Sequence, residues 1–381
     1  MALRYTSGVQ GRRGTRGINE NTTHGNILAA KAFQRDSNRA ALGDIGNKEN
    51  KDPVGKGKKA STKGPTQTSK STLSRNVANA HLALFTKTTE SVKDPTPVLT
   101  EEVQDDIEDI DRADFDNPQL VAEYINEIYH HMRQLEITYR INDKFLAGQQ
   151  INEKMRTILI DWLIQVHLRF HLLQETLYLT VNIIDRFLQT QSIHRSKLQL
   201  VGVTAMLIAS KYEEIYAPEV ADFVYITDNA YTKNEILDME VTMLKTLNFN
   251  LGNPLSLHFL RRNSKAGNVD SQHHTMAKYF MELCLPEYDM VSLLPSEIAS
   301  ASLLLAVKIC NQFEWNATLQ HYSGYTEEKL YPIARKIVNI VSKSATSKYQ
   351  AVRTKYSSSK FMKISLSTDL QPDRISKAFG N

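Results

Sequence analysis

Residues 203–211 read VTAMLIASK and residues 300–308 read SASLLLAVK, two stretches of small and apolar residues that each end in lysine. Each stretch is apolar on every side of a helix, which indicates a helix surrounded by other helices rather than one at a surface. Their repetition predicts two similar helical halves, each built around one buried helix. Because strand patterns are nearly absent from the sequence, we predict an all-α protein.

Helix-start signals divide the rest of the chain. Asn117 precedes a proline that suits a first helical position, Asn152 can cap the apolar segment after it, and Thr232 and Glu235 have capping-box spacing. The predicted order is a disordered tail (1–100), an acidic linker (101–117), an N-terminal helix (118–136), a first helical bundle (137–251), a second helical bundle (252–370) and a C-terminal tail (371–381).

The net charge of +4 is unevenly distributed along the 381 residues. Residues 1–100 hold 17 Lys/Arg against 7 Asp/Glu, a net +10, whereas the remaining residues hold 29 against 35, a net −6. The tail also lacks periodicity and cannot bury enough apolar surface to offset the entropy of ordering, so we predict disorder. A basic tail can bind nucleic acid, but the acidic remainder adds no positive surface, and we expect no direct nucleic-acid partner.

Several classes of protein are excluded by motifs that the sequence lacks. Cys284 and Cys310 are the two cysteines, without CxxC spacing or a histidine cluster, so we expect reduced thiols, no metal and no other cofactor. There is no phosphate-binding GxxxxGK[ST] loop, GxSxG, HExxH or kinase motif set, so we expect no enzyme. No uncharged apolar run reaches the roughly 18 residues of a membrane span, and the first residues, MALRYTSGVQGRRG, lack the apolar segment that a signal peptide would have. We therefore expect a soluble intracellular protein.

Two motifs in the helical part carry a resemblance to a known family. Residues 155–163, MRTILIDWL, and residues 210–216, SKYEEIY, followed by PEV at 218–220, resemble the cyclin box. The likeness extends from about residue 118 to about residue 370 and covers two tandem cyclin boxes. It implies a non-catalytic subunit that binds and activates a cyclin-dependent kinase.

The tail carries two further motifs. Residues 39–47, RAALGDIGN, resemble a destruction box, and residues 48–50 match the KEN box. Together they are typical of the mitotic, B-type members of the family, and imply destruction at mitotic exit through the anaphase-promoting ubiquitin ligase and its activators. Such linear motifs need accessible backbone, which a disordered tail provides. The residues that would make these contacts are Arg39, Leu42, Ile45, Asn47, Lys48, Glu49 and Asn50.

The resemblance also implies a kinase-binding face. Lys211, Tyr212 and Glu240 would face the kinase's regulatory helix, and Ile128 would add a contact from the N-terminal helix. The alternative is that both charges are simply exposed at the surface. Activation would be allosteric, because the cyclin would favour the active position of that helix, complete the kinase's Lys–Glu pair and order its activation loop.

Arg156 lies in a segment that is apolar almost all round. An unpaired guanidinium there would be costly, and the family pairs this arginine with an aspartate of the next helix, here Asp185. We interpret the two as a structural ion pair.

Met155, Ile158, Leu159 and Trp162 fall at i, i+3, i+4 and i+7 of one helix. Spacing alone favours core packing, but the opposite side of this helix is also apolar and can serve the core. The resemblance then implies a shallow groove for substrates or inhibitors that carry an Arg-x-Leu motif. Its residues would be Met155, Ile158, Leu159, Trp162, Gln165, Leu198 and Gln199.

Two groove residues have particular features. Gln165 stands where some relatives carry an acid that holds the peptide's arginine, and a neutral amide should weaken that bond. Gln199 has the alternative role of capping-box partner to Ser196.

Two weaker signals remain. Thr96-Pro97 is a minimal phosphorylation site, and Leu99, Val103, Ile107 and Ile110 are spaced either as a nuclear export signal or as the front of an amphipathic linker. We expect the protein in both cytoplasm and nucleus.

Two rival functions are less consistent with the sequence. A transcription factor of the same fold would carry a zinc ribbon and a basic body, whereas the first cysteine here is Cys284 and the residues after 100 have a net charge of −6. A helical-repeat scaffold would need more than the two repeats found here.

Overall fold

The computed structural model describes residues 107–310, 314–371 and 374–375. These residues form helices and turns without a strand, which confirms the all-α prediction. None of their helices is long and apolar enough to cross a membrane. The tail motifs at residues 39–50, together with Thr96, lie outside the described residues.

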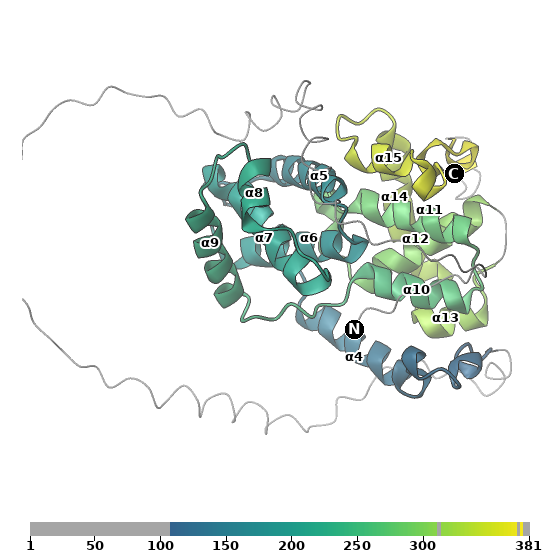
Figure 1. Ribbon diagram of the computed structural model, residues 1–381. Helices are drawn as coiled ribbons and strands as arrows, with labels where there is room; N and C mark the ends of the chain where they lie inside the picture. Colours follow the sequence, from purple (N-terminus) through teal and green to yellow (C-terminus); the bar gives the residue numbers. More distant parts are fainter. Residues whose placement is uncertain (1–106, 311–313, 372–373, 376–381) are drawn as a thin grey trace, which may run out of the picture. The chain divides into compact units, whose positions relative to one another are not determined.

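The first half is built around α7 (Leu198–Glu213), in which every residue from 200 to 210 is buried. The other helices of this half are α5 (Glu153–Arg169), α6 (Gln174–Thr190), α8 (Val220–Ile226) and α9 (Lys233–Thr246). All four pack on α7 (Figure 1). A Cβ on Gly202 of α7 would come within 2.7 Å of Leu159 Cδ1, so this glycine lets α5 and α7 approach closely.

The second half repeats the plan around α12 (Pro295–Ile309), whose residues 299–307 are all buried. The other helices are α10 (Ser256–Ala266), α11 (Ser271–Cys284), α13 (Ala317–Ser323), α14 (Glu327–Ser344) and α15 (Ala351–Tyr356). Helices α10, α11 and α14 pack on α12 (Figure 1). The two apolar stretches therefore do form the buried helices predicted for them.

The helix starts predicted from capping residues agree with the structure at three of four places, and the first of them, Asn117, caps the 3-10 turn Pro118–Leu120. The Asn152 side chain caps α5, and Thr232 forms a capping box with Glu235 at the start of α9. The alternative role of Gln199 as a capping partner is wrong. Ser196 lies inside a 3-10 turn that runs directly into α7, and its N–H donates to His194 Nδ1, so the chain lacks the extended break that a cap requires.

The N-terminal helix is shorter than predicted. Two 3-10 turns, Pro118–Leu120 and Ala122–Tyr124, come first, and α4 spans Ile125–Thr138. Between the turns Val121 has a left-handed backbone with φ of 49°, which interrupts a continuous helix. Helix α4 is fastened to the second half, because buried Glu136 accepts hydrogen bonds from the Ser296 N–H at 2.9 Å and hydroxyl at 2.7 Å.

Part of the segment predicted as a linker is also packed. From residue 107 onward it contacts the second half: Asp111 is only 4% exposed and pairs with Arg262 and Lys265 of α10. Ile110 packs against the core. The acidic linker predicted for residues 101–117 is therefore packed on the second half from residue 107 onward, because its acidic side chains neutralise the cationic end of α10. Likewise Ile375, assigned to the C-terminal tail, is buried.

Candidate functional site

Lys211 in the last turn of α7 and Glu240 in α9 form an ion pair. Lys211 Nζ lies 2.7 and 2.9 Å from the two carboxylate oxygens of Glu240. The lysine side chain is 47% exposed and the glutamate side chain 13%. The expectation of two separate exposed charges is thus replaced by one neutral pair at the surface. The ammonium keeps a third N–H and the carboxylate keeps lone pairs, so the pair can still hydrogen-bond a partner's main chain.

Large exposed apolar side chains flank both members of this pair in the sequence. Tyr212, Ile215 and Val241 are exposed, and Tyr216 is 92% exposed. We call Lys211, Tyr212, Ile215, Tyr216, Glu240 and Val241 the α7–α9 face. Large apolar side chains gathered at one place on a surface are typical of interaction sites. Sequence reasoning missed three of its members, Ile215, Tyr216 and Val241, although a Tyr/Ile run directly after a helix was a visible signal.

Helix α4 and the 3-10 turn Ala122–Tyr124 before it present a second exposed apolar surface. Ile128 is exposed at 38% and Tyr124 at 54%. Tyr129 instead points inward, where its hydroxyl donates to the His258 carbonyl at 2.9 Å and its ring packs edge-on to Phe259. The inward side chains hold α4 on the second half, and Ile128 remains available to a partner.

Arg156 and Asp185 meet in a buried bidentate pair. Arg156 Nε lies 2.6 Å from Asp185 Oδ1, and Nη2 lies 2.7 Å from Oδ2. Arg156 is 1% exposed, and its Nη1 donates to the Leu285 carbonyl at 3.1 Å. Thr157 adds a hydrogen bond to the Pro286 carbonyl. Helix α5 thereby binds both its own half and the segment after α11 in the other, which is a structural role.

The apolar residues predicted to line the groove divide into two sets by their exposure to solvent. Met155, Ile158 and Trp162 are half-buried and reach the surface. Leu159 and Leu198 are completely buried. The prediction that the whole stripe is free of the core is wrong for Leu159, because Gly202 brings α7 close enough to enclose it.

The two polar residues assigned to the groove, Gln165 and Gln199, lie as follows in the structure. Gln165 Nε2 donates to Asp161 Oδ2 at 3.2 Å, while Asp161 Oδ1 accepts from the Ala351 N–H at 3.0 Å. Burial raises the pKa of Asp161, against the lowering effect of these hydrogen bonds. Gln199 is half-buried. Asp161 therefore joins α5 to the start of α15, a tertiary contact that no sequence pattern announced.

Comparison with known proteins places these features in a family. Residues 127–252 match the cyclin N-terminal domain and residues 254–370 match the cyclin C-terminal domain. The chain is 52% identical over 378 residues to G2/mitotic-specific cyclin-B of Patella vulgata, covering 92% of this chain and 93% of the relative. It is 49% identical over 353 residues to G2/mitotic-specific cyclin-B2 of Rana japonica, covering 87% of this chain and 89% of the relative.

A solved structure agrees at the level of the fold. The viral cyclin of herpesvirus saimiri superposes with a TM-score of 0.51 at 20% identity, covering 58% of this chain and 98% of the viral chain. Cyclins are regulatory subunits of protein kinases and have no catalytic activity of their own. On its two domains and its relatives, the chain belongs to the cyclin family and, within it, to the G2/mitotic-specific B-type cyclins.

Proposed function

We propose that this mitotic cyclin, an activating subunit of a cyclin-dependent kinase, contacts the kinase's regulatory helix through the α7–α9 face and Ile128. The Lys211–Glu240 pair amid exposed apolar side chains is the observation that carries the proposal. Burying a pair that already carries no net charge avoids the penalty of desolvating a lone ion. The remaining donor and lone pairs can then fix the orientation of the kinase main chain, while the aromatic side chains supply binding energy.

Activation follows from differential binding. If the α7–α9 face fits the active position of the regulatory helix better than the inactive position, binding shifts the kinase population toward the active state. The kinase's own Lys–Glu pair is then complete and its activation loop ordered. The cyclin supplies no catalytic group.

The second half offers a matched control. Lys308, at the position of α12 that corresponds to Lys211, forms an ion pair with Glu327. We expect Lys211→Ala with Glu240→Ala to raise the cyclin concentration for half-maximal kinase activation by roughly 30-fold or more, with helical circular dichroism unchanged. Lys308→Ala with Glu327→Ala should leave activation intact. Wild-type activation by the first variant would show that the face is wrongly assigned.

The half-buried side chains of Met155, Ile158 and Trp162 support a second proposal, that the cyclin docks Arg-x-Leu substrates or inhibitors. A leucine can pack on these three side chains, with Leu159 and Leu198 beneath as core. The amide of Gln165, already bonded to Asp161, provides a neutral and therefore weaker partner for the arginine.

The tail motifs support a third proposal, that the anaphase-promoting ubiquitin ligase removes the protein at mitotic exit. Arg39 would supply charge and Leu42 an apolar anchor, and the KEN residues Lys48, Glu49 and Asn50 would give a second contact. We also propose that the protein divides its time between cytoplasm and nucleus.

A further inference from the structure

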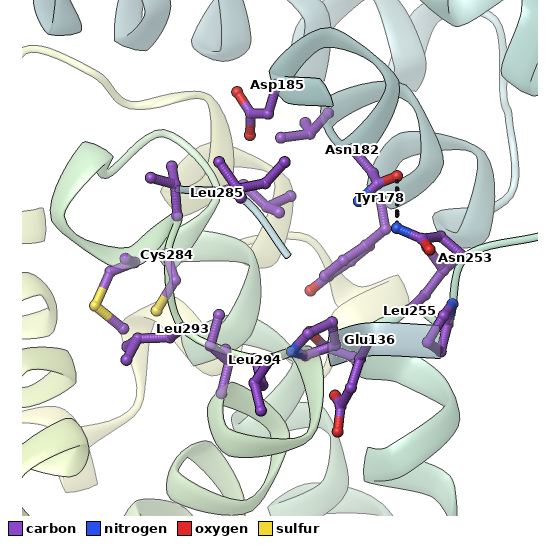
Figure 2. A pocket seen from close by; sticks show the side chains of 18 of the residues that line it. Glu136, Tyr178, Asn182, Asp185, Asn253, Leu255, Cys284, Leu285, Leu293 and Leu294 are labelled. Atoms are coloured by element: carbon purple, nitrogen blue, oxygen red, sulfur yellow. Dashed lines mark hydrogen bonds between the residues drawn. The ribbon is translucent and has the colours of Figure 1, made fainter. Parts of the chain in front are cut away.

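A pocket of about 110 Å³, open to solvent on one side and called the cavity below, lies where the end of α4, helix α6 of the first half and helices α10–α12 of the second half meet (Figure 2). Its wall is mostly apolar and takes side chains from both halves. The apolar side chains that line it include Val181, Leu255, Met281, Leu285, Met290 and Ile298.

Two polar groups in this wall lack a hydrogen-bond partner among the described residues. They are the Tyr178 hydroxyl and Asn253 Oδ1, in side chains that are 5% and 8% exposed. Asn253 Nδ2 donates to Asn182 Oδ1 at 3.2 Å, which leaves only its oxygen unpaired. Figure 2 shows the Tyr178 hydroxyl pointing into the middle of the cavity. Buried polar groups are normally hydrogen-bonded, so each of these two atoms indicates a missing partner.

The buried charged groups in the wall are already paired. Arg156 and Asp185 bind each other, and Glu136 accepts two hydrogen bonds from Ser296. Arg140, the remaining charged residue of the wall, is exposed to solvent and its Nε donates to the Ser292 carbonyl. An ionic group inside the apolar space would therefore lack a buried counter-charge, which is unfavourable. The ligand that fits the wall is neutral.

We propose that this cavity binds a small neutral molecule with one hydroxyl on an apolar ring, the chemistry of a phenol. The ligand hydroxyl would accept a hydrogen bond from the Tyr178 hydroxyl, which points into the cavity, while its ring contacts the apolar side chains. The enclosed volume is smaller than the engineered apolar cavity of about 150 Å³ that holds benzene in another protein, but this pocket is open on one side, so a single ring need not fit wholly within it. Since both halves contribute to the wall, the bound molecule stabilises them as one unit.

The test is a titration of the full chain with phenol, toluene and benzoate, followed by calorimetry and thermal unfolding. Phenol should bind saturably and raise Tm. Toluene, which lacks the hydroxyl, should bind about 2- to 12-fold more weakly, the range expected for one hydrogen bond. Benzoate should not bind. Equal affinity for phenol and toluene, or no saturable binding of phenol, would overturn the proposal.

Three variants locate the site. Tyr178→Phe should remove the preference for phenol over toluene without lowering Tm, because the deleted hydroxyl has no partner among the described residues. Tyr231→Phe is the matched control: its hydroxyl donates to the Ser196 carbonyl at 2.8 Å, so Tm should fall while the preference is kept. Val181→Met should fill the cavity and abolish binding of both ligands.

Two outcomes of these variant measurements would contradict the assignment of phenol binding to this cavity. If Val181→Met bound phenol as the wild type does, phenol would be binding elsewhere. If Tyr178→Phe lowered Tm as much as Tyr231→Phe, with no saturable phenol binding, the cavity would hold ordered water only.

Discussion

Arg262 and Asp111 form a buried bidentate ion pair, with Nη1–Oδ1 and Nη2–Oδ2 distances of 2.5 and 2.6 Å. The pair ties the segment before α4 to α10, across 151 positions of sequence. Burial alone would raise the pKa of Asp111, but the hydrogen bonds and charges of Arg262 and Lys265 outweigh it and hold the pKa below the usual 3.8. The resulting stability is present above pH 3.8 and is lost as the pH falls through the folded-state pKa.

Truncation tests this connection. Deletion of residues 1–100 should leave the free energy of unfolding of the helical body almost unchanged. Deletion through Asn117 should lower it measurably, because Arg262 and Lys265 lose the carboxylate of Asp111 and the packing of Ile110 is lost. Denaturant unfolding of the two truncated chains gives the comparison. Equal stability would mean that the segment before α4 is dispensable.

A single and a double variant together measure how much the Arg156–Asp185 ion pair contributes to the free energy of unfolding. Arg156→Met should destabilise the protein by about 3–5 kcal/mol, since Asp185 then stays buried without a partner. Adding Asp185→Leu should recover most of that loss, because both charges are then replaced by apolar groups. Urea unfolding measures both variants. A double variant as unstable as the single one would contradict the ion-pair account.

Docking is tested by Met155→Ala with Trp162→Ala. Kinase activity on a short peptide should be unchanged, while phosphorylation of substrates that carry Arg-x-Leu should slow several-fold. Leu159→Ala is the contrasting control, expected to cost about 2–5 kcal/mol of stability because its side chain is fully buried. Global unfolding of the Met155/Trp162 variant would assign the whole stripe to the core.

Degradation is tested in dividing cells. Arg39→Ala with Leu42→Ala should prolong the life of the protein as cells leave mitosis, and changing Lys48, Glu49 and Asn50 as well should prolong it further. Because the two motifs make adjacent contacts, changing either motif alone should slow degradation only in part. Deletion of residues 1–100 should give the same persistence with kinase activation intact. Wild-type turnover of the truncated chain would refute the role of the tail.

The amino-acid sequence by itself determined the helices, the two buried central helices and the caps at Asn152 and Thr232. These features depend on side chains within a few positions of each other, so the helical period and the capping spacings carry the information. The motifs at residues 155–163 and 210–216 likewise indicate the family on their own, because the order of their residues is distinctive without any knowledge of their contacts.

Apart from the Arg156–Asp185 pair, which the family resemblance already implied, only the tertiary structure decided which distant side chains meet. Lys211 and Glu240 are 29 positions apart, and whether they stay separate or pair depends on how α7 packs on α9. Leu159 and Trp162 belong to the same predicted stripe, yet close approach at Gly202 encloses only Leu159. The cavity at Tyr178 is bounded by both halves. Periodicity shows which face of a helix is apolar, but only the packing of distant segments determines what covers that face.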